Sequence, residues 1–134
     1  MGKLKTLVEL PELILALIEE RNCVLFGSGA KYHLGLRLAL PNDYDIIVPK
    51  SDWYIVVSIV QDAGYQFIGN TSSGNGYRFR NYTEGVSIRQ IDLVAMEDDS
   101  VDSFVNILKR AQCHAQDNSI FCIYSSSGLK RKLT

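Results

Sequence analysis

A short apolar run that ends in a glycine-rich turn constrains the fold of this chain more than any other segment. Cys23-Val24-Leu25-Phe26 is followed at once by Gly27-Ser28-Gly29. A short apolar run bounded by turn residues is typical of a buried strand, and a helical pattern resumes after the turn. The sequence therefore predicts a strand that enters a tight turn and continues into a helix.

Helical and strand-like segments alternate along the whole chain. Helices are expected where apolar residues recur at helical spacing, over residues 10–21, 30–39 (ended by Pro41), 51–64 (capped by Ser51) and from Ser100 to about 108. Strands are expected over residues 23–26, 43–48, 65–68, 77–80, 86–94 and 120–124. This order predicts one domain over residues 1–134, of the α/β or α+β class, with a mixed sheet covered by helices and a short basic tail at 129–134.

Composition sets the broad class. The 134 residues suffice for one hydrophobic core, and 46% hydrophobic with 22% charged residues is the balance of a soluble globular protein. A net charge of −1 provides no global field toward nucleic acids or anionic membranes. Cys23, Cys113 and Cys122 match neither a disulfide framework nor zinc-ligand spacing. Glutamates interrupt the first apolar stretch, so we expect neither a signal peptide nor a membrane span, and a reducing, cytoplasmic location.

Three aspartates stand in positions that favour a metal site. Asp43 and Asp45 are two residues apart in an expected strand, so they project from one face, roughly 6.5–7 Å apart at the backbone. Asp92 lies inside the apolar run Ile91-Asp92-Leu93-Val94 of a later expected strand. Carboxylates that crowd together repel one another, and a divalent cation such as Mg²⁺ or Mn²⁺ removes that cost because it takes oxygen ligands.

Each of these acids also has a purely structural interpretation. Asp43 can belong to the turn that precedes the strand, and Asp45 can be an exposed strand residue. Asp92 can form an ion pair with Arg78 or Arg89. Since Asp-x-Asp occurs in many surface strands, the choice depends on the segment upstream.

The Gly27-Ser28-Gly29 turn offers backbone N–H groups and a helix N-terminus to an anion. A dinucleotide-binding fingerprint would require a glycine three residues beyond Gly29, where Tyr32 stands. The chain also contains no Gly-Lys-Ser or Gly-Lys-Thr of the Walker type. The sequence therefore excludes both of these phosphate-binding classes.

Taken together, these segments resemble the DNA-polymerase-β-type nucleotidyltransferase superfamily. The residues that carry the resemblance are Phe26-Gly27-Ser28, Asp43-Tyr44-Asp45 on a strand, and Ile91-Asp92-Leu93 on a later strand, so it spans residues 22–94. It implies a nucleotidyltransferase-like fold. It also implies an enzyme that moves a nucleoside monophosphate from a nucleoside triphosphate such as ATP to a hydroxyl, with release of pyrophosphate.

The resemblance implies a role for each matching residue. Asp43 and Asp45 would bridge two Mg²⁺ or Mn²⁺ ions, and Asp92 would bind the ion nearest the acceptor hydroxyl and serve as its base. Many members of the superfamily carry an Arg or Lys after the Gly-Ser turn, and Lys31 is the nearest such residue here. The implied nucleotide-binding residues are Gly27, Ser28, Gly29 and Lys31.

The acceptor stays open between a small molecule, a protein side chain and an RNA end. We expect the acceptor site to be completed by a second copy of the chain, by a partner protein, or by the Ser-, Asn- and Gly-rich loop at 70–76. One alternative is a non-catalytic binding or regulatory module that keeps the fold and acts on a partner protein. Another is an unrelated α/β domain whose acids coincide by chance. The presence of all three carboxylates favours the enzyme.

Several other residues have more than one interpretation. We expect His33 to be structural, since no ligand-spaced companion accompanies it. Arg78 and Arg80 flank the expected position of Asp92, where they can contact phosphate or acceptor, or simply face solvent. Tyr77 and Phe79 are expected in the core rather than as a platform for a base.

Overall fold

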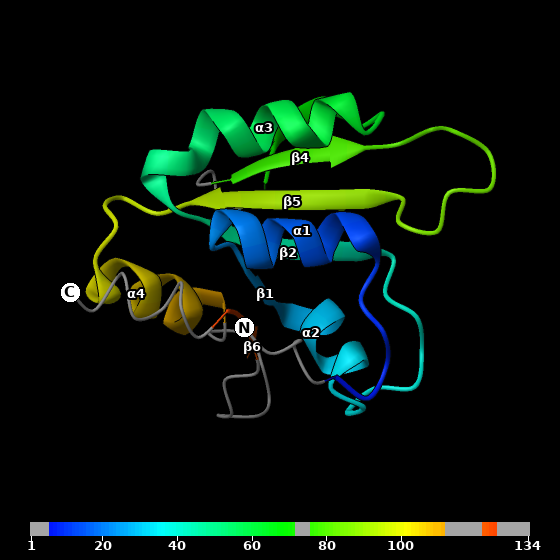
Figure 1. Ribbon diagram of the computed structural model, residues 1–134, viewed down its shortest axis with the longest axis horizontal. Helices are drawn as coiled ribbons and strands as arrows, with labels where there is room; N and C mark the ends of the chain where they lie inside the picture. Colours follow the sequence, from blue (N-terminus) through cyan, green and yellow to red (C-terminus); the bar gives the residue numbers. More distant parts are fainter. Residues whose placement is uncertain (1–5, 72–75, 112–121, 126–134) are drawn as a thin grey trace.

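The computed structural model describes residues 6–71, 76–111 and 122–125. Figure 1 shows helices packed around a central sheet. The helices are α1 (Glu12–Arg21), α2 (Gly27–His33), α3 (Trp53–Asp62), which the short 3-10 helix η1 (Lys50–Asp52) precedes, and α4 (Val101–Ala111). The strands are β1 (Val24–Phe26), β2 (Asp43–Val48), β3 (Gln66–Asn70), β4 (Gly76–Arg80), β5 (Gln90–Ala95) and β6 (Cys122–Ile123).

The six strands form one mixed sheet in the order β3-β4-β5-β2-β1-β6. The central pair, β2 and β5, is parallel, and the other neighbouring pairs are antiparallel. Four α-helices accompany this sheet within the described residues. The α+β class with a mixed sheet, which the sequence predicts, is therefore confirmed.

Alternation along the strands gives the sheet two different faces. Leu25, Tyr44 and Ile46 point to the face that α1 and α3 cover, where they join the main core. The neighbouring residues of the same strands point the other way, and Phe26 and Ile47 pack there with the apolar residues Phe104 and Ile107 of α4. Because side chains of a strand alternate, this arrangement fixes the direction of every polar residue on β2 and β5.

The second helix differs from the one expected at 30–39, because it begins three residues earlier, within the glycine turn, and ends at His33. Its end is set by Gly35, whose φ of +79° lies in the left-handed region that favours glycine. The Leu36 N–H donates to the Lys31 carbonyl (2.8 Å) and the Gly35 N–H to the Tyr32 carbonyl (3.1 Å). These two bonds form a Schellman motif, which ends the helix well before Pro41.

Two other expectations need correction. The strand expected at 86–94 begins only at Gln90, because the Ile88 carbonyl accepts a hydrogen bond from the Tyr65 hydroxyl (2.7 Å) rather than from a neighbouring strand. Ser51 does not cap the third helix. Asp99, far along the chain, accepts the Lys50 N–H (2.6 Å) and the Ser51 N–H (3.4 Å) through its carboxylate.

The expected N-cap of the last helix is confirmed, since the Ser100 hydroxyl oxygen accepts the Ser103 N–H at 3.2 Å. The core of the loop expected at 70–76, the first two residues of the strand expected at 120–124 and the tail at 129–134 lie outside the described residues. Of the helices that the structure describes, none has the length and apolar character needed to cross a membrane.

Candidate metal and nucleotide site

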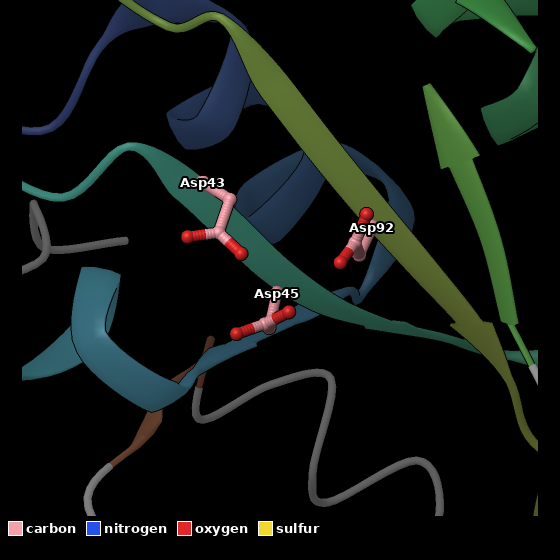
Figure 2. A group of neighbouring side chains, drawn as sticks. All are labelled: Asp43, Asp45 and Asp92. Carbon is pink, nitrogen blue, oxygen red and sulfur yellow. The ribbon is translucent and has the colours of Figure 1, made fainter. Parts of the chain in front are cut away.

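The three aspartates come together on the two parallel central strands. Asp45 on β2 lies directly opposite Asp92 on β5, and Asp43 lies two residues before Asp45 on the same face. Their carboxylates each offer an oxygen atom within 4.8 Å of the others. Figure 2 shows the three side chains on one side of the sheet, converging on a common region. The structure thus brings together the three acids that the sequence singles out.

The opposite face of β2 explains why these acids point outward from the core. Tyr44 and Ile46 alternate with Asp43 and Asp45, and both are almost fully buried in the main core. A shift of the strand by one residue would bury the carboxylates and expose the tyrosine, at a large desolvation cost. The hydrophobic residues of β2 therefore hold the carboxylates in place.

Gly27, the first residue of α2, lies against Asp45. Its φ is +71°, and a Cβ added to it would come within 2.7 Å of Asp45 Oδ2. Both the backbone conformation and this close approach require glycine. The start of α2 is thereby held directly beside the carboxylate cluster.

A buried histidine fixes α2 on the sheet. His33 Nδ1 lies 3.1 Å from the Val8 carbonyl, and Nε2 lies 2.8 Å from the Tyr44 hydroxyl. A carbonyl only accepts, so Nδ1 carries the proton and Nε2 accepts the hydrogen bond of Tyr44. Burial lowers the pKa of His33 and raises the pKa of Tyr44 to about 12, which keeps both groups neutral. His33 is therefore structural, as expected.

The other residues expected to bind nucleotide occupy different positions on α2. Gly29 is buried, and a Cβ added to it would lie 3.0 Å from the Tyr44 ring, on the face of β2 that points away from the carboxylates. Its lack of a side chain lets α2 pack closely on β2. Ser28 is half-buried in the first turn, next to Gly27, whereas Lys31 lies in the last turn. Of this set, the structure brings Gly27 into the cluster.

Arg78 on β4 makes a two-pronged ion pair with Asp92. Its Nε donates to Oδ1 at 3.1 Å and its Nη2 donates to Oδ2 at 3.2 Å. Asp92 also accepts a longer hydrogen bond from Gln90 Nε2 to Oδ1, at 3.4 Å. Arg80 Nη2 in turn donates to Gln90 Oε1 at 2.7 Å. The pairing of Asp92 with Arg78 and its place in the carboxylate cluster, which the sequence offers as alternatives, therefore coexist.

The electrostatics of the cluster are unfavourable for three negative charges. Burial, with the charges of Asp43 and Asp92 adding to it, raises the pKa of Asp45 to about 7, although Arg78 opposes the shift. Ionised Asp45 is therefore costly without a further positive charge. Carboxylate oxygens are the ligands that Mg²⁺ and Mn²⁺ prefer, so the residues present fit such an ion.

Gln90 is the member of this site that the sequence does not reveal. It lies opposite Asp43 in the strand register and contacts Asp92, two residues along its own strand. The spacing of two could have indicated it, since residues i and i+2 of a strand share a face.

The aromatic residues of β4 belong to the other face, where Phe79 is buried while Tyr77 is 40% exposed and packs edge-on against Trp53. Tyr77 is thus only partly the core residue that was expected.

Comparison with known proteins gives no relative. The chain matches no protein-family model, and neither a curated protein nor a solved structure shows significant similarity to it.

Proposed function

We propose that this protein is a metal-dependent nucleotidyltransferase, which moves a nucleoside monophosphate from a nucleoside triphosphate to a hydroxyl acceptor and releases pyrophosphate. The observation that carries the proposal is the convergence of Asp43, Asp45 and Asp92 on adjacent parallel strands, with oxygen atoms within 4.8 Å of one another. Three carboxylates at this spacing are a donor set for Mg²⁺ or Mn²⁺, and two ions bridged by carboxylates are suited to phosphoryl chemistry.

The path of the chain through the site supports the same proposal. A strand leads into Gly27-Ser28, a helix follows, and the next strand carries Asp43 and Asp45 before β5 supplies Asp92. This is the order of elements that the resemblance to the nucleotidyltransferase superfamily implies. Gly27 contributes independently, because its lack of a side chain lets the backbone at the start of α2 lie directly against Asp45, where an added Cβ would come within 2.7 Å of Oδ2.

The resemblance assigns a chemical role to each residue of the site. Asp43 and Asp45 would hold the ions, which would neutralise charge on the triphosphate and lower the pKa of the acceptor hydroxyl. The backbone at Gly27 and Ser28 binds the outer phosphates. Asp92 takes the proton of the acceptor hydroxyl, and the hydroxyl oxygen attacks the α-phosphorus. The bond between this phosphorus and the bridging oxygen breaks, and pyrophosphate leaves in line with the attack.

The test is the transfer of label from an α-labelled triphosphate. Purified protein is incubated with each nucleoside triphosphate, Mg²⁺ and host lysate, with γ-labelled triphosphate in parallel. We expect a labelled product from the α-label alone, and none from Asp45→Asn or Asp92→Asn. Asp62→Asn, an exposed acid on α3, is the matched control and should keep transfer. Treatment of the product with protease or ribonuclease then separates a protein, an RNA and a small-molecule acceptor.

Two results would replace the proposal. Binding of the metal–triphosphate complex with no labelled product from any lysate fraction would favour the non-catalytic module. A product labelled from the γ-position would indicate a phosphotransferase rather than a nucleotidyltransferase.

A further inference from the structure

Asp92 already has most of its hydrogen-bonding capacity occupied. A carboxylate offers about four lone-pair sites, two on each oxygen. Oδ1 accepts from Arg78 Nε and Gln90 Nε2, and Oδ2 accepts from Arg78 Nη2. One site on Oδ2 is left, so an ion that takes Asp92 as a ligand binds beside the guanidinium of Arg78 and competes with it for the same carboxylate.

Arg78 has room to move, whereas Asp92 does not. The Arg78 side chain is 36% exposed, against 6% for Asp92. On the side of β4 away from Asp92, the strand neighbour of Arg78 is Gly69 on β3, next to a register irregularity. Among the described residues, a Cβ added to Gly69 would meet nothing within 4 Å. The exposed guanidinium of Arg78 therefore lies beside a strand neighbour that carries no side chain.

The positive charge of Arg78 affects how tightly a divalent ion binds to Asp92. Arg78 and a divalent ion both carry positive charge and both require the same carboxylate, so each weakens the binding of the other. An ion that arrives on a polyphosphate brings negative charge with it, and the displaced guanidinium can pair with phosphate oxygens in a bidentate manner. Arg78 would then exchange its ion pair with Asp92 for an ion pair with phosphate.

We propose that Arg78 competes with the divalent ion for Asp92 and thereby makes ion binding depend on a polyphosphate ligand. The bare ion binds weakly because it must share the carboxylate with the positive charge of Arg78, and the metal–triphosphate complex binds well because it gives Arg78 a new partner. This inference rests on the proposed function, since it concerns the same metal site. Arg78 is then a positioning residue, through which the site binds the metal–triphosphate complex in preference to the free ion.

The test compares two affinities in wild type and Arg78→Gln, measured by calorimetry. One titration uses Mn²⁺ alone, and the other uses Mn²⁺ preformed with a triphosphate whose α–β bridge is a non-hydrolysable methylene. We expect wild type to prefer the complex strongly. In Arg78→Gln, bare Mn²⁺ should bind on the order of tenfold more tightly, the usual size of a coupling between two sites, and the preference for the complex should shrink by a similar factor.

Two further variants make the result specific. Arg80→Gln removes the same charge from the same face of β4 but breaks a contact with Gln90 instead of Asp92, so its effect on bare Mn²⁺ should be much smaller. Arg78→Lys keeps a positive charge beside the buried carboxylate, and it is therefore the control for loss of the fold. Because an ammonium lacks the two-pronged geometry, it should tighten Mn²⁺ binding by a smaller factor than Gln.

The outcomes separate this inference from the proposed function. If Arg78→Gln and Arg78→Lys bind bare Mn²⁺ no more tightly than wild type, while Asp45→Asn loses the ion, Arg78 is not a competitor and the metal site stands. An Arg80→Gln effect as large as that of Arg78→Gln would reduce the role of Arg78 to general charge, and would overturn the inference. If neither wild type nor the Arg78 variants bind Mn²⁺ in either form, both proposals fail. Tighter Mn²⁺ binding in Arg78→Gln without any transfer activity in wild type would sustain the inference and remove the enzyme.

Discussion

Asp45 and Asp92 lie directly opposite each other in the parallel register of β2 and β5, and their row of the sheet continues to Arg78 on one side and Phe26 on the other. Within this row the cation Arg78 thus faces two carboxylates. Asp43, two residues before Asp45 on the same strand, adds a third. Phe26 packs in an apolar cluster at one end of the row and Asp92 is buried, so solvent screens these charges incompletely. An added cation should therefore lower the free energy of the folded protein.

Substitution of Gly27, compared with that of a second glycine, distinguishes the effect of backbone strain from the effect of damage to the metal site. Gly27→Ala should lose Mn²⁺ binding, because the new Cβ would lie 2.7 Å from Asp45 Oδ2 and displace that carboxylate. Gly85→Ala is the matched control, since Gly85 also has a positive φ (+84°) but nothing within 4 Å of an added Cβ. Both variants should lose about 1 kcal/mol of unfolding free energy through strain, as measured by urea denaturation. Normal Mn²⁺ affinity in a folded Gly27→Ala would remove the turn from the site.

The pH dependence of stability reports on Asp45. Its pKa is about 7 in the folded protein against 3.8 without the environment of the fold, so the folded state binds the proton more tightly. Stability without metal should therefore fall as pH rises from about 4 to about 7, by at most about 4 kcal/mol at 1.4 kcal/mol per pKa unit. Asp45→Asn should lack this fall. The measurement is the unfolding free energy of both proteins at pH 4, 5.5 and 7.

Subtracting the two profiles removes other titrating groups. Burial lowers the pKa of His33, so His33 makes stability fall as pH drops below 6.5, the opposite sign to Asp45. Both proteins contain His33, and its contribution cancels in the difference. A difference between wild type and Asp45→Asn that is constant from pH 4 to pH 7 would contradict the assignment of Asp45 as a desolvated, repelled carboxylate.

The hydrogen bond between Tyr44 and His33 should matter for stability alone. Tyr44→Phe leaves His33 Nε2 buried without its 2.8 Å donor, which should cost about 1–3 kcal/mol of unfolding free energy. Since Tyr44 points to the core and the carboxylates point to the other face, Mn²⁺ affinity should stay within about twofold of wild type, as expected for sites that share no partner. Urea denaturation and Mn²⁺ titration of the same preparation check both halves. Unchanged stability combined with lost Mn²⁺ binding would show that the two faces are coupled.

The parts of the fold that the sequence predicts are those that local patterns determine. The alternation of Asp43-Tyr44-Asp45-Ile46 indicates both the strand and the face of its acids, and Ser100 marks the start of α4. What the sequence does not indicate depends on partners distant in the chain. Asp99 caps η1 from 49 residues away, and Tyr65 ends the ladder of β5 through the Ile88 carbonyl. Neither partner leaves a local signal.

The site follows the same division. The three carboxylates can be predicted because each strand reveals its own face, and their meeting follows once β2 and β5 are neighbours. The bidentate grip of Arg78 cannot be predicted, since it depends on β4 pairing with β5 in a register that places Arg78 opposite Asp92 rather than opposite its neighbours. Pairing with Arg89 is equally compatible with the sequence. Only the register of the sheet decides between them.

The most direct test of the central claim is a set of thermal melts of wild type and Asp45→Asn, each with and without Mg²⁺ and a nucleoside triphosphate. Asp45→Asn removes a repelled charge at nearly constant shape, so without ligand it should melt at or above the wild-type Tm. Ligand should raise the wild-type Tm by several degrees through mass action, because the folded state alone assembles the three carboxylates, and should leave Asp45→Asn unshifted. A wild-type Tm that ignores Mg²⁺ and triphosphate, together with an Asp45→Asn protein that melts several degrees below wild type, would contradict the account and make the aspartates structural.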